Sequence, residues 1–200
     1  MDRVETIAKY AAMMANLEYS IGEEPKIFMV QEDHCYATAT GADFSNITES
    51  DIEDLTYYDV IEGEVLEELP EMEALVIAQP PYLGICIAAN REIPAVLDDM
   101  AQIIGQRVCI VAHEKKAIAH ALSKAAGVMT KDGYVITCGR NLYEAYVAMT
   151  VLEKNAEVTL KAAVLGGAKE ISSFDAKLMR EVYKKKYSKA EKEHKDECEG

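Results

Sequence analysis

Cys138 is the best candidate nucleophile in the sequence. It lies near the end of the apolar stretch "YVITCG", just before "RNLYEAY", which has the pattern of a capped helix start. A thiol near a helix N-terminus can have a lowered pKa and react as the thiolate. No His or Asp stands beside Cys138 in the sequence to act as a base. We therefore expect a packed, inert cysteine, with a thiol-dependent enzyme as the weaker alternative.

The histidines are the next candidates, as metal ligands. His113 and His120 lie seven positions apart on a helix predicted for residues 113–127, which puts them on one face but about 10 Å apart. His34 and Cys35 are adjacent on a predicted strand and would point to opposite faces. Neither pair is expected to hold one metal ion, so these side chains are expected in the core or on the surface.

The stretch "ALVIAQPPYLG", residues 74–84, places the polar Gln79 after five apolar residues. Such a run predicts a buried strand, and the two prolines that follow suit the first turn of a helix. Ligands of α/β proteins bind beyond the carboxyl ends of strands. Gln79 therefore stands at a position where chemistry is expected.

Predicted strands and helices alternate along the chain, which indicates one layered α/β domain. The predicted helices cover residues 2–19, 113–127 with Gly127 as C-cap, 141 to about 165 with an Asn141–Glu144 capping box, and 172–187. The predicted strands cover residues 26–30, 35–41, 57–65 with a turn at Gly63, 74–78, 107–112 and 134–139; residues 45–55 suit a short helix or turn. The domain is expected over 1–187, followed by a charged, disordered tail over 188–200.

The acidic residues are concentrated in one half of the chain. Residues 27–90 contain 14 Asp and Glu side chains and no Lys or Arg, which accounts for the whole net charge of −14. This distribution argues against nucleic acid and anionic membranes as partners. The five cysteines are widely spaced without a CxxC pair, and the first 20 residues lack a signal-peptide pattern. The cytoplasm is therefore the expected location.

Four stretches resemble the class II aldolase and adducin head family, which includes the fuculose-phosphate aldolases. They are "TATGADFSNITESDI", "ALVIAQPPYLGICIA", "KDGYVITCGRNLYEAYVAMTVLEKNAEV" and "LKAAVLGGAKEISSFDAKLMREVY", in the family's order, and the resemblance covers about residues 1–187. It implies a three-layer α/β domain with a central, mostly antiparallel sheet flanked by helices. It also implies a homo-oligomer, commonly a tetramer with active sites between subunits.

The resemblance further implies where a zinc site would be. Active members bind zinc through two histidines of an HTH phrase and one of an NHG phrase, and the metal stabilises an enediolate. The matching positions here are Ile77, Gln79 and Asp132. Isoleucine cannot ligate a metal, and one Gln with one Asp makes a poor zinc site.

Other family features also differ. The helix that carries a catalytic glutamate before the HTH strand is expected to be largely missing, with Glu71 or Glu73 as its nearest substitute. The glycine-rich phosphate loop is replaced by "SIGEEPKIF", in which Glu23 and Glu24 would repel phosphate.

Two main hypotheses follow from these residues. The first is an aldolase-like protein without zinc-dependent activity or any cofactor, which binds an unknown small molecule or serves assembly, as the adducin head does. The alternative is a divergent aldolase or lyase acting on a small carbonyl or sugar substrate. It would bind Mg²⁺ or Mn²⁺, in preference to zinc, through Asp132, Gln79 and a carboxylate such as Glu71 or Glu73.

Overall fold

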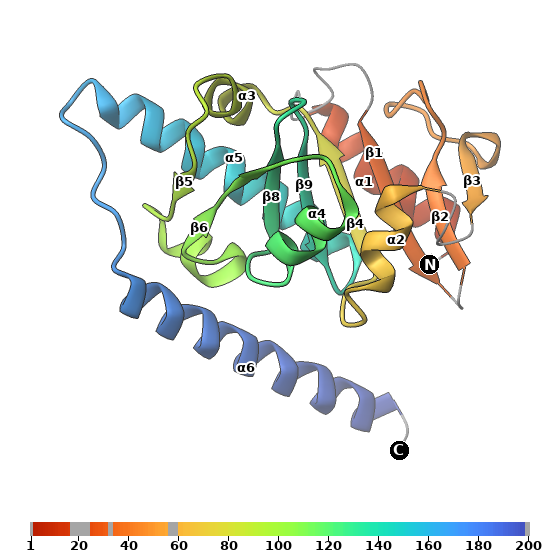
Figure 1. The fold of residues 1–200 in the computed structure, drawn as a ribbon. Coiled ribbons are helices and arrows are strands. Elements are labelled where there is room, and N and C mark those ends of the chain that lie inside the picture. The colour runs from red at the N-terminus through yellow and green to blue at the C-terminus, as the bar shows by residue number, and fades with distance from the viewer. Residues whose placement is uncertain (1, 17–24, 32–33, 56–59, 199–200) are drawn as a thin grey trace.

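Seven strands form one mixed sheet in the order β3-β2-β1-β4-β9-β8-β7 (Figure 1). They span β1 (Lys26–Gln31), β2 (His34–Thr38), β3 (Ile52–Leu55), β4 (Ala74–Ala78), β7 (Ile110–Val111), β8 (Gly127–Thr130) and β9 (Val135–Gly139). Only β7 and β8 pair in parallel; the other neighbours are antiparallel. The short strands β5 (Ile93–Pro94) and β6 (Arg107–Val108) pair separately. The expected mostly antiparallel sheet is confirmed.

The structure is a computed structural model. It describes residues 2–16, 25–31, 34–55 and 60–198, with side chains as far as residue 186. The expectations for Glu23 and Glu24, and for the beginning of the strand predicted over 57–65, lie outside these ranges.

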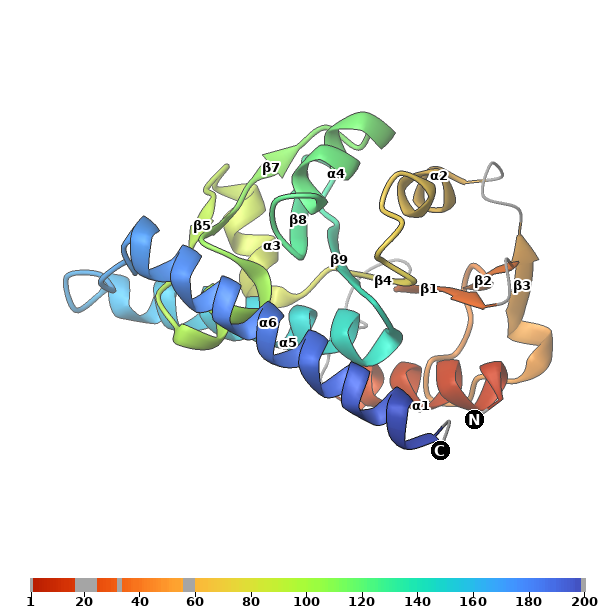
Figure 2. The ribbon, with the colours of Figure 1, turned by 90° about the horizontal axis from the view of Figure 1, so that it is seen from below.

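Helices cover both faces of the sheet and so make three layers (Figure 2). On one face lie α1 (Arg3–Asn16), α3 (Pro81–Ala88) and α5 (Leu142–Ala163), which bury Ile7, Leu83 and Met149 in one apolar cluster. On the other lie α2 (Ile61–Glu67) and α4 (Lys115–Leu122), which bury Val65 and Ile118 in a second cluster. The three-layer prediction is therefore confirmed.

Strand β4 is buried along its whole length because both of its faces are covered. Side chains alternate along a strand, so Val76 and Ala78 face the cluster under α5, whereas Leu75 and Ile77 face the cluster under α2 and α4. Gln79 follows directly after this strand and is partly exposed. As predicted, a helix begins here, with Pro81 as the first residue of α3.

Two buried polar residues of α5 hold the segment after β4 in place. The Glu153 carboxylate accepts hydrogen bonds from the backbone N–H groups of Tyr82 at 2.8 Å and Leu83 at 3.0 Å, and so caps α3. Asn155 accepts from the N–H groups of Val96 and Leu97 at 3.0 and 3.1 Å. These bonds satisfy N–H groups that would be costly to bury without partners.

Three predicted elements differ from the structure. The strand predicted over residues 57–65 is wrong from residue 61 onward, because Ile61–Glu67 form the helix α2 and Gly63 is a buried helical residue. The helix C-cap predicted at Gly127 is also wrong: α4 ends at Leu122, and Gly127 begins β8, where an added Cβ would lie 3.1 Å from Leu152 Cδ2. The strand predicted over 107–112 is divided at Cys109, since β6 pairs with β5 and β7 with β8.

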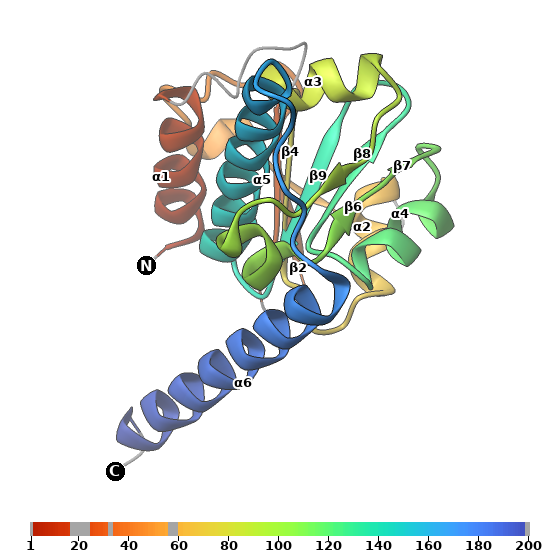
Figure 3. The same ribbon diagram turned by 90° about the vertical axis from the view of Figure 1, so that its left-hand side faces the viewer.

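The last two helices begin as predicted. Asn141 caps α5 by accepting a hydrogen bond from the Glu144 N–H at 3.0 Å, and Ser172 accepts from the Asp175 N–H at 3.1 Å before α6 (Ser173–Cys198). Helix α6 packs against the π-helix η2 (Met100–Ile104) and then points away from the body (Figure 3). It includes most of residues 188–200, where we expected a disordered tail, and the division at residue 187 stays a prediction.

The short helix or turn predicted within residues 45–55 is the helix η1 (Glu49–Asp51), followed by β3. The Asp51 carboxylate accepts from the Thr48 N–H at 2.8 Å and fixes its start. Within the described residues, we find no helix with both the length and the apolar composition of a membrane span.

Candidate functional site

Gln79 lies beside the turn that joins β8 to β9. Ala78, the last residue of β4, pairs with Val135, the first residue of β9. Gln79 follows Ala78 and therefore lies opposite the residues that precede β9. Gly133 has a φ of +103°, which an L side chain rarely adopts, and a Cβ added there would lie 3.5 Å from Gln79 Nε2. The fold therefore brings Gln79 next to the turn that carries Asp132.

Asp132 contacts His113, which lies in the loop before α4 and not on the helix predicted for it. The His113 Nδ1 lies 2.7 Å from Asp132 Oδ2. The other ring nitrogen, Nε2, lies 3.6 Å from Oε1 of Glu62, in the first turn of α2. One imidazole thus stands between two carboxylates from separate segments, and we call Glu62, His113 and Asp132 the carboxylate–histidine cluster.

The environment of Asp132 favours its ionised form. Burial alone would raise the pKa of Asp132, but hydrogen bonds from Thr130 and His113, with the charge of His113, lower it below its ordinary value. The side chains of Glu62 and His113 are 16% and 25% exposed, so both are accessible from one side only. A carboxylate on one imidazole nitrogen fixes the ring orientation and leaves the other nitrogen to exchange protons or hydrogen-bond a ligand.

Ion pairs connect helices α2 and α4 next to the cluster. Lys115, two residues after His113, has its Nζ 3.9 Å from Glu64 Oε2 and 3.4 Å from Glu68 Oε1. The side chains of Lys115 and Glu64 are about one-third exposed, so each pair contributes modestly, on the order of 0.5 kcal/mol. Together they hold the loop of His113 against the helix of Glu62.

The three positions that the resemblance matches to zinc ligands do not fit zinc. Ile77 is 3% exposed and packs in the apolar cluster under α2 and α4, and Asp132 is hydrogen-bonded to His113. Among the residues that the structure describes, no three His, Cys, Asp or Glu side chains gather in a way that could hold a metal ion. The acids expected to help, Glu71 and Glu73, lie before β4, at the opposite end of this strand from Gln79.

The sequence matches the model of the family described as "Class II Aldolase and Adducin N-terminal domain" over residues 5–160. The chain belongs to this family. A search of curated proteins finds no match.

Solved structures of class II aldolases share the fold. An L-fuculose 1-phosphate aldolase superposes with a TM-score of 0.82 at 18% identity, covering 92% of this chain and 97% of that one. The L-fuculose 1-phosphate aldolase of Glaciozyma antarctica PI12 gives 0.74 at 17% identity, covering 88% and 79%. YgbL of Escherichia coli, described as a putative aldolase/epimerase/decarboxylase, gives 0.70 at 17% identity, covering 88% and 96%. At these identities the likeness establishes the class II aldolase fold alone.

The segment before β4 differs from what the family resemblance led us to expect. The family's helix before the HTH strand was expected to be largely missing; the structure has the seven-residue helix Ile61–Glu67 in this segment, which supplies Glu62 to the cluster. A strand was predicted here because Gly63 suggested a turn and because a short apolar run does not distinguish a helix from a strand.

The remaining candidates lie away from the cluster. Cys138 is 2% exposed, and burial raises its pKa to about 12, which suits an inert thiol. His34 contacts Asp54 at 3.1 Å, and His120 Nε2 lies 2.7 Å from Lys124 Nζ. The sequence did not predict His113 as a partner of Asp132, because the two residues are 19 positions apart. The one feature of the sequence that could have indicated a functional role for His113 is its position just after a predicted strand.

Proposed function

We propose that this class II aldolase-like protein does not cleave sugar phosphates with zinc, and that it binds a small molecule at the carboxylate–histidine cluster. The observation that carries the proposal is the 2.7 Å contact between Asp132 and His113, at a position where the family resemblance implies a zinc ligand. The carboxylate there accepts a hydrogen bond from an imidazole, and Ile77 fills a second ligand position with an apolar side chain.

The charge of the cluster indicates what it would bind. Glu62 and Asp132 give two negative charges against at most one positive charge on His113, and the neighbouring Lys115 is paired with Glu64 and Glu68. This surrounding repels a phosphate group. A neutral or cationic molecule that carries hydroxyl or amino groups is the ligand class that fits, such as a free sugar.

Metal content and aldol cleavage together test this proposal. The protein is produced with zinc in the medium, its metal content is measured, and cleavage of L-fuculose 1-phosphate is assayed beside an active class II aldolase. We expect no stoichiometric zinc and no cleavage above background. One zinc per chain together with retro-aldol activity would show that the proposal is wrong.

A divergent lyase is the second candidate, and the orientation of His113 by Asp132 favours it over an inert surface. In its Mg²⁺ or Mn²⁺ form it requires Asp132, Gln79 and a further carboxylate to share one ion at oxygen–metal distances of about 2.0 to 2.6 Å. Glu71 and Glu73 lie at the far end of β4, and Glu62 lies on the opposite side of the His113 ring from Asp132, so the third carboxylate would have to move toward the ion. Saturable stabilisation by Mn²⁺ that Asp132→Asn abolishes would support this candidate.

Assembly into a homo-oligomer, with a tetramer as the form that the resemblance implies, is also proposed. Three large apolar side chains between α5 and the start of α6 are more than half exposed: Val164, Leu165 and Phe174. Light scattering after gel filtration tests the proposal, and a monomer at micromolar concentration would contradict it. A cytoplasmic location stays a prediction.

A further inference from the structure

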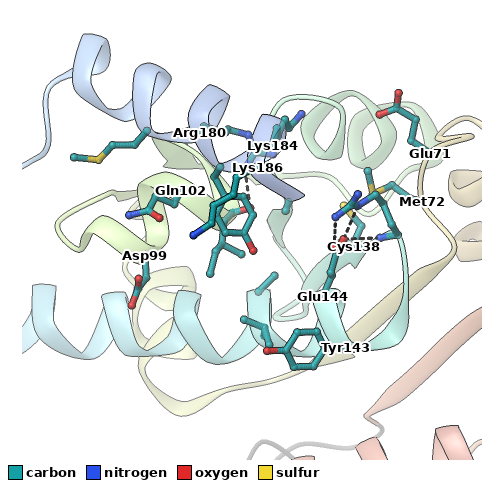
Figure 4. Close-up of a pocket in the computed structure, with 18 of the residues that line it drawn as sticks. Glu71, Met72, Asp99, Gln102, Cys138, Tyr143, Glu144, Arg180, Lys184 and Lys186 are labelled. Atoms are coloured by element: carbon teal, nitrogen blue, oxygen red, sulfur yellow. Dashed lines mark hydrogen bonds and ion pairs between the residues drawn. The ribbon is translucent and has the colours of Figure 1, made fainter. Parts of the chain in front are cut away.

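A cavity of about 890 Å³ lies between α6, the first turns of α5 and the segment before β4 (Figure 4). Cys138 and Gly139, at the end of β9, line it. Asp132 precedes β9, so the cavity and the carboxylate–histidine cluster lie at opposite ends of this strand. The cavity is therefore separate from the carboxylate–histidine cluster.

Basic side chains gather at this cavity although the chain as a whole is strongly acidic. Arg140, Arg180, Lys184 and Lys186 line it, together with three acids. One of the acids, Glu144, is engaged by Arg140, whose Nε donates to Glu144 Oε2 at 3.1 Å. The cavity is thus lined by four basic and three acidic side chains, in a chain whose net charge is −14.

Arg180 is the most informative of these side chains. It is half-buried, and its Nη1 donates a hydrogen bond to the Ile103 carbonyl oxygen at 2.7 Å. No carboxylate of the described residues lies within ion-pair distance of its guanidinium. Burial lowers the pKa of Arg180, and the ionisable groups that oppose this shift are the Cys138 thiol and the Tyr183 hydroxyl. A partly desolvated guanidinium without a counter-charge is unfavourable, and an anion in the cavity would relieve it.

The N-terminus of α5 adds to this preference. Asn141, the cap of this 22-residue helix, lines the same cavity. The dipole of a long helix favours negative charge at this end. An oxyanion in the cavity would therefore have the Arg180 guanidinium as a donor, with the N-terminal end of α5, which Asn141 caps, in the same lining.

We propose that this cavity binds a small molecule that carries a phosphate or carboxylate group, with the Arg180 guanidinium as its main contact. The proposal is independent of the ligand proposed for the carboxylate–histidine cluster, which repels anions. It assigns the cavity a binding role and no chemistry, because Cys138 in its wall is buried.

Titration of the full chain with inorganic phosphate, and separately with citrate, in chloride buffer of constant ionic strength tests the proposal. Calorimetry measures affinity, and amide chemical shifts locate the site. We expect saturable binding of at least one probe, with shifts at Gly139 and Asn141. The stronger probe distinguishes a phosphate ligand from a carboxylate ligand. No saturable binding of either probe, or shifts confined to Gly133 and its neighbours, would overturn the proposal.

Three variants identify the contact. Arg180→Gln removes the charge and keeps a donor for the Ile103 carbonyl, and it is expected to weaken binding about tenfold or more. Lys177→Gln is the matched control, since Lys177 lies on the same helix but does not line the cavity, and its affinity is expected to be unchanged. If Arg180→Gln does not fold, Lys186→Gln replaces it, with a loss of about threefold expected from one lost exposed charge. Equal affinity in the control and in the folded cavity variant would overturn the proposal.

Discussion

His113 Nδ1 lies 2.7 Å from Asp132 Oδ2, and this contact joins the loop after β7 to the turn between β8 and β9. The other nitrogen of the same ring faces Glu62 of α2. Three segments that are distant in the sequence thus meet at one imidazole.

Replacing Asp132 with Asn is expected to remove a pH-dependent part of the stability. The folded-state pKa of Asp132 is lowered, so its contribution is present above the unfolded pKa and is lost as pH falls through the folded pKa. The side chain is 46% exposed, and solvent screening limits the expected loss at neutral pH to about 0.5 kcal/mol. Urea unfolding at neutral and acidic pH measures it. A loss of equal size at both pH values would contradict the prediction.

Glu153 is expected to contribute a pH dependence of stability that is opposite in sign to that of Asp132. Burial raises its pKa although the Tyr82 and Leu83 N–H groups oppose the shift. Its contribution is therefore fully present below the unfolded pKa and decreases as pH rises through the folded pKa. Glu153→Gln should remove this decrease, whereas Glu153→Ala leaves two N–H groups without acceptors and should cost about 2–4 kcal/mol.

Unfolding curves between acidic and neutral pH measure both Glu153 variants. Glu181→Gln, an exposed position on α6, is the control and should leave the pH dependence unchanged. A Glu153→Ala variant as stable as the unchanged protein would show that the carboxylate does not cap α3.

Gly139→Ala is expected to destabilise the protein strongly. A Cβ there would lie 2.5 Å from the Ala145 backbone N and 2.8 Å from the Asn141 backbone O, so α5 would have to move away from β9. We expect a loss of about 3 kcal/mol or more in the free energy of unfolding. Gly84→Ala is the matched control: nothing lies within 4 Å, and a helical alanine should add about 0.5–1 kcal/mol. Similar effects of the two substitutions would contradict the packing described here.

Cys138 is expected to react slowly with iodoacetamide at neutral pH, because its thiol is buried and its pKa is raised to about 12. Cys109 is only half-buried and should react faster. Labelling is followed by peptide mass spectrometry in a Cys198→Ser background. Fast, selective labelling of Cys138 would revive the thiol-enzyme hypothesis.

Introducing three histidines, as Ile77→His, Gln79→His and Asp132→His together, is expected to create zinc binding. Residues 77 and 79 are two apart in an extended segment and therefore point to the same face, beside the turn of Asp132. Burying an imidazole in place of Ile77 should cost about 2–4 kcal/mol. The double variant without the change at Ile77 is the control and should bind zinc much more weakly. Equal zinc content in both variants would contradict the assignment of these positions.

Much of the fold follows from the sequence because its signals are local. Five consecutive apolar residues before Gln79 indicate a strand buried on both faces, and Asn141 with Glu144 marks the start of α5. The family could likewise be inferred, since short phrases such as "IAQPPY" keep their order along the chain. Where local patterns are ambiguous the inference failed, as at Gly63, which suggests a turn in the sequence but is buried in α2.

By itself, the sequence determined which side chains stand at the positions that the resemblance matches to zinc ligands: Ile77, Gln79 and Asp132. Only the tertiary structure decided what surrounds them, because His113 and Glu62 reach Asp132 through sheet pairing and helix packing that no local pattern records. The same is true of Arg180, whose environment depends on how α6 lies against η2. The residue type at each position is given by the sequence. The partner of a charged side chain depends instead on which residues, distant in the sequence, the fold brings close to it in space.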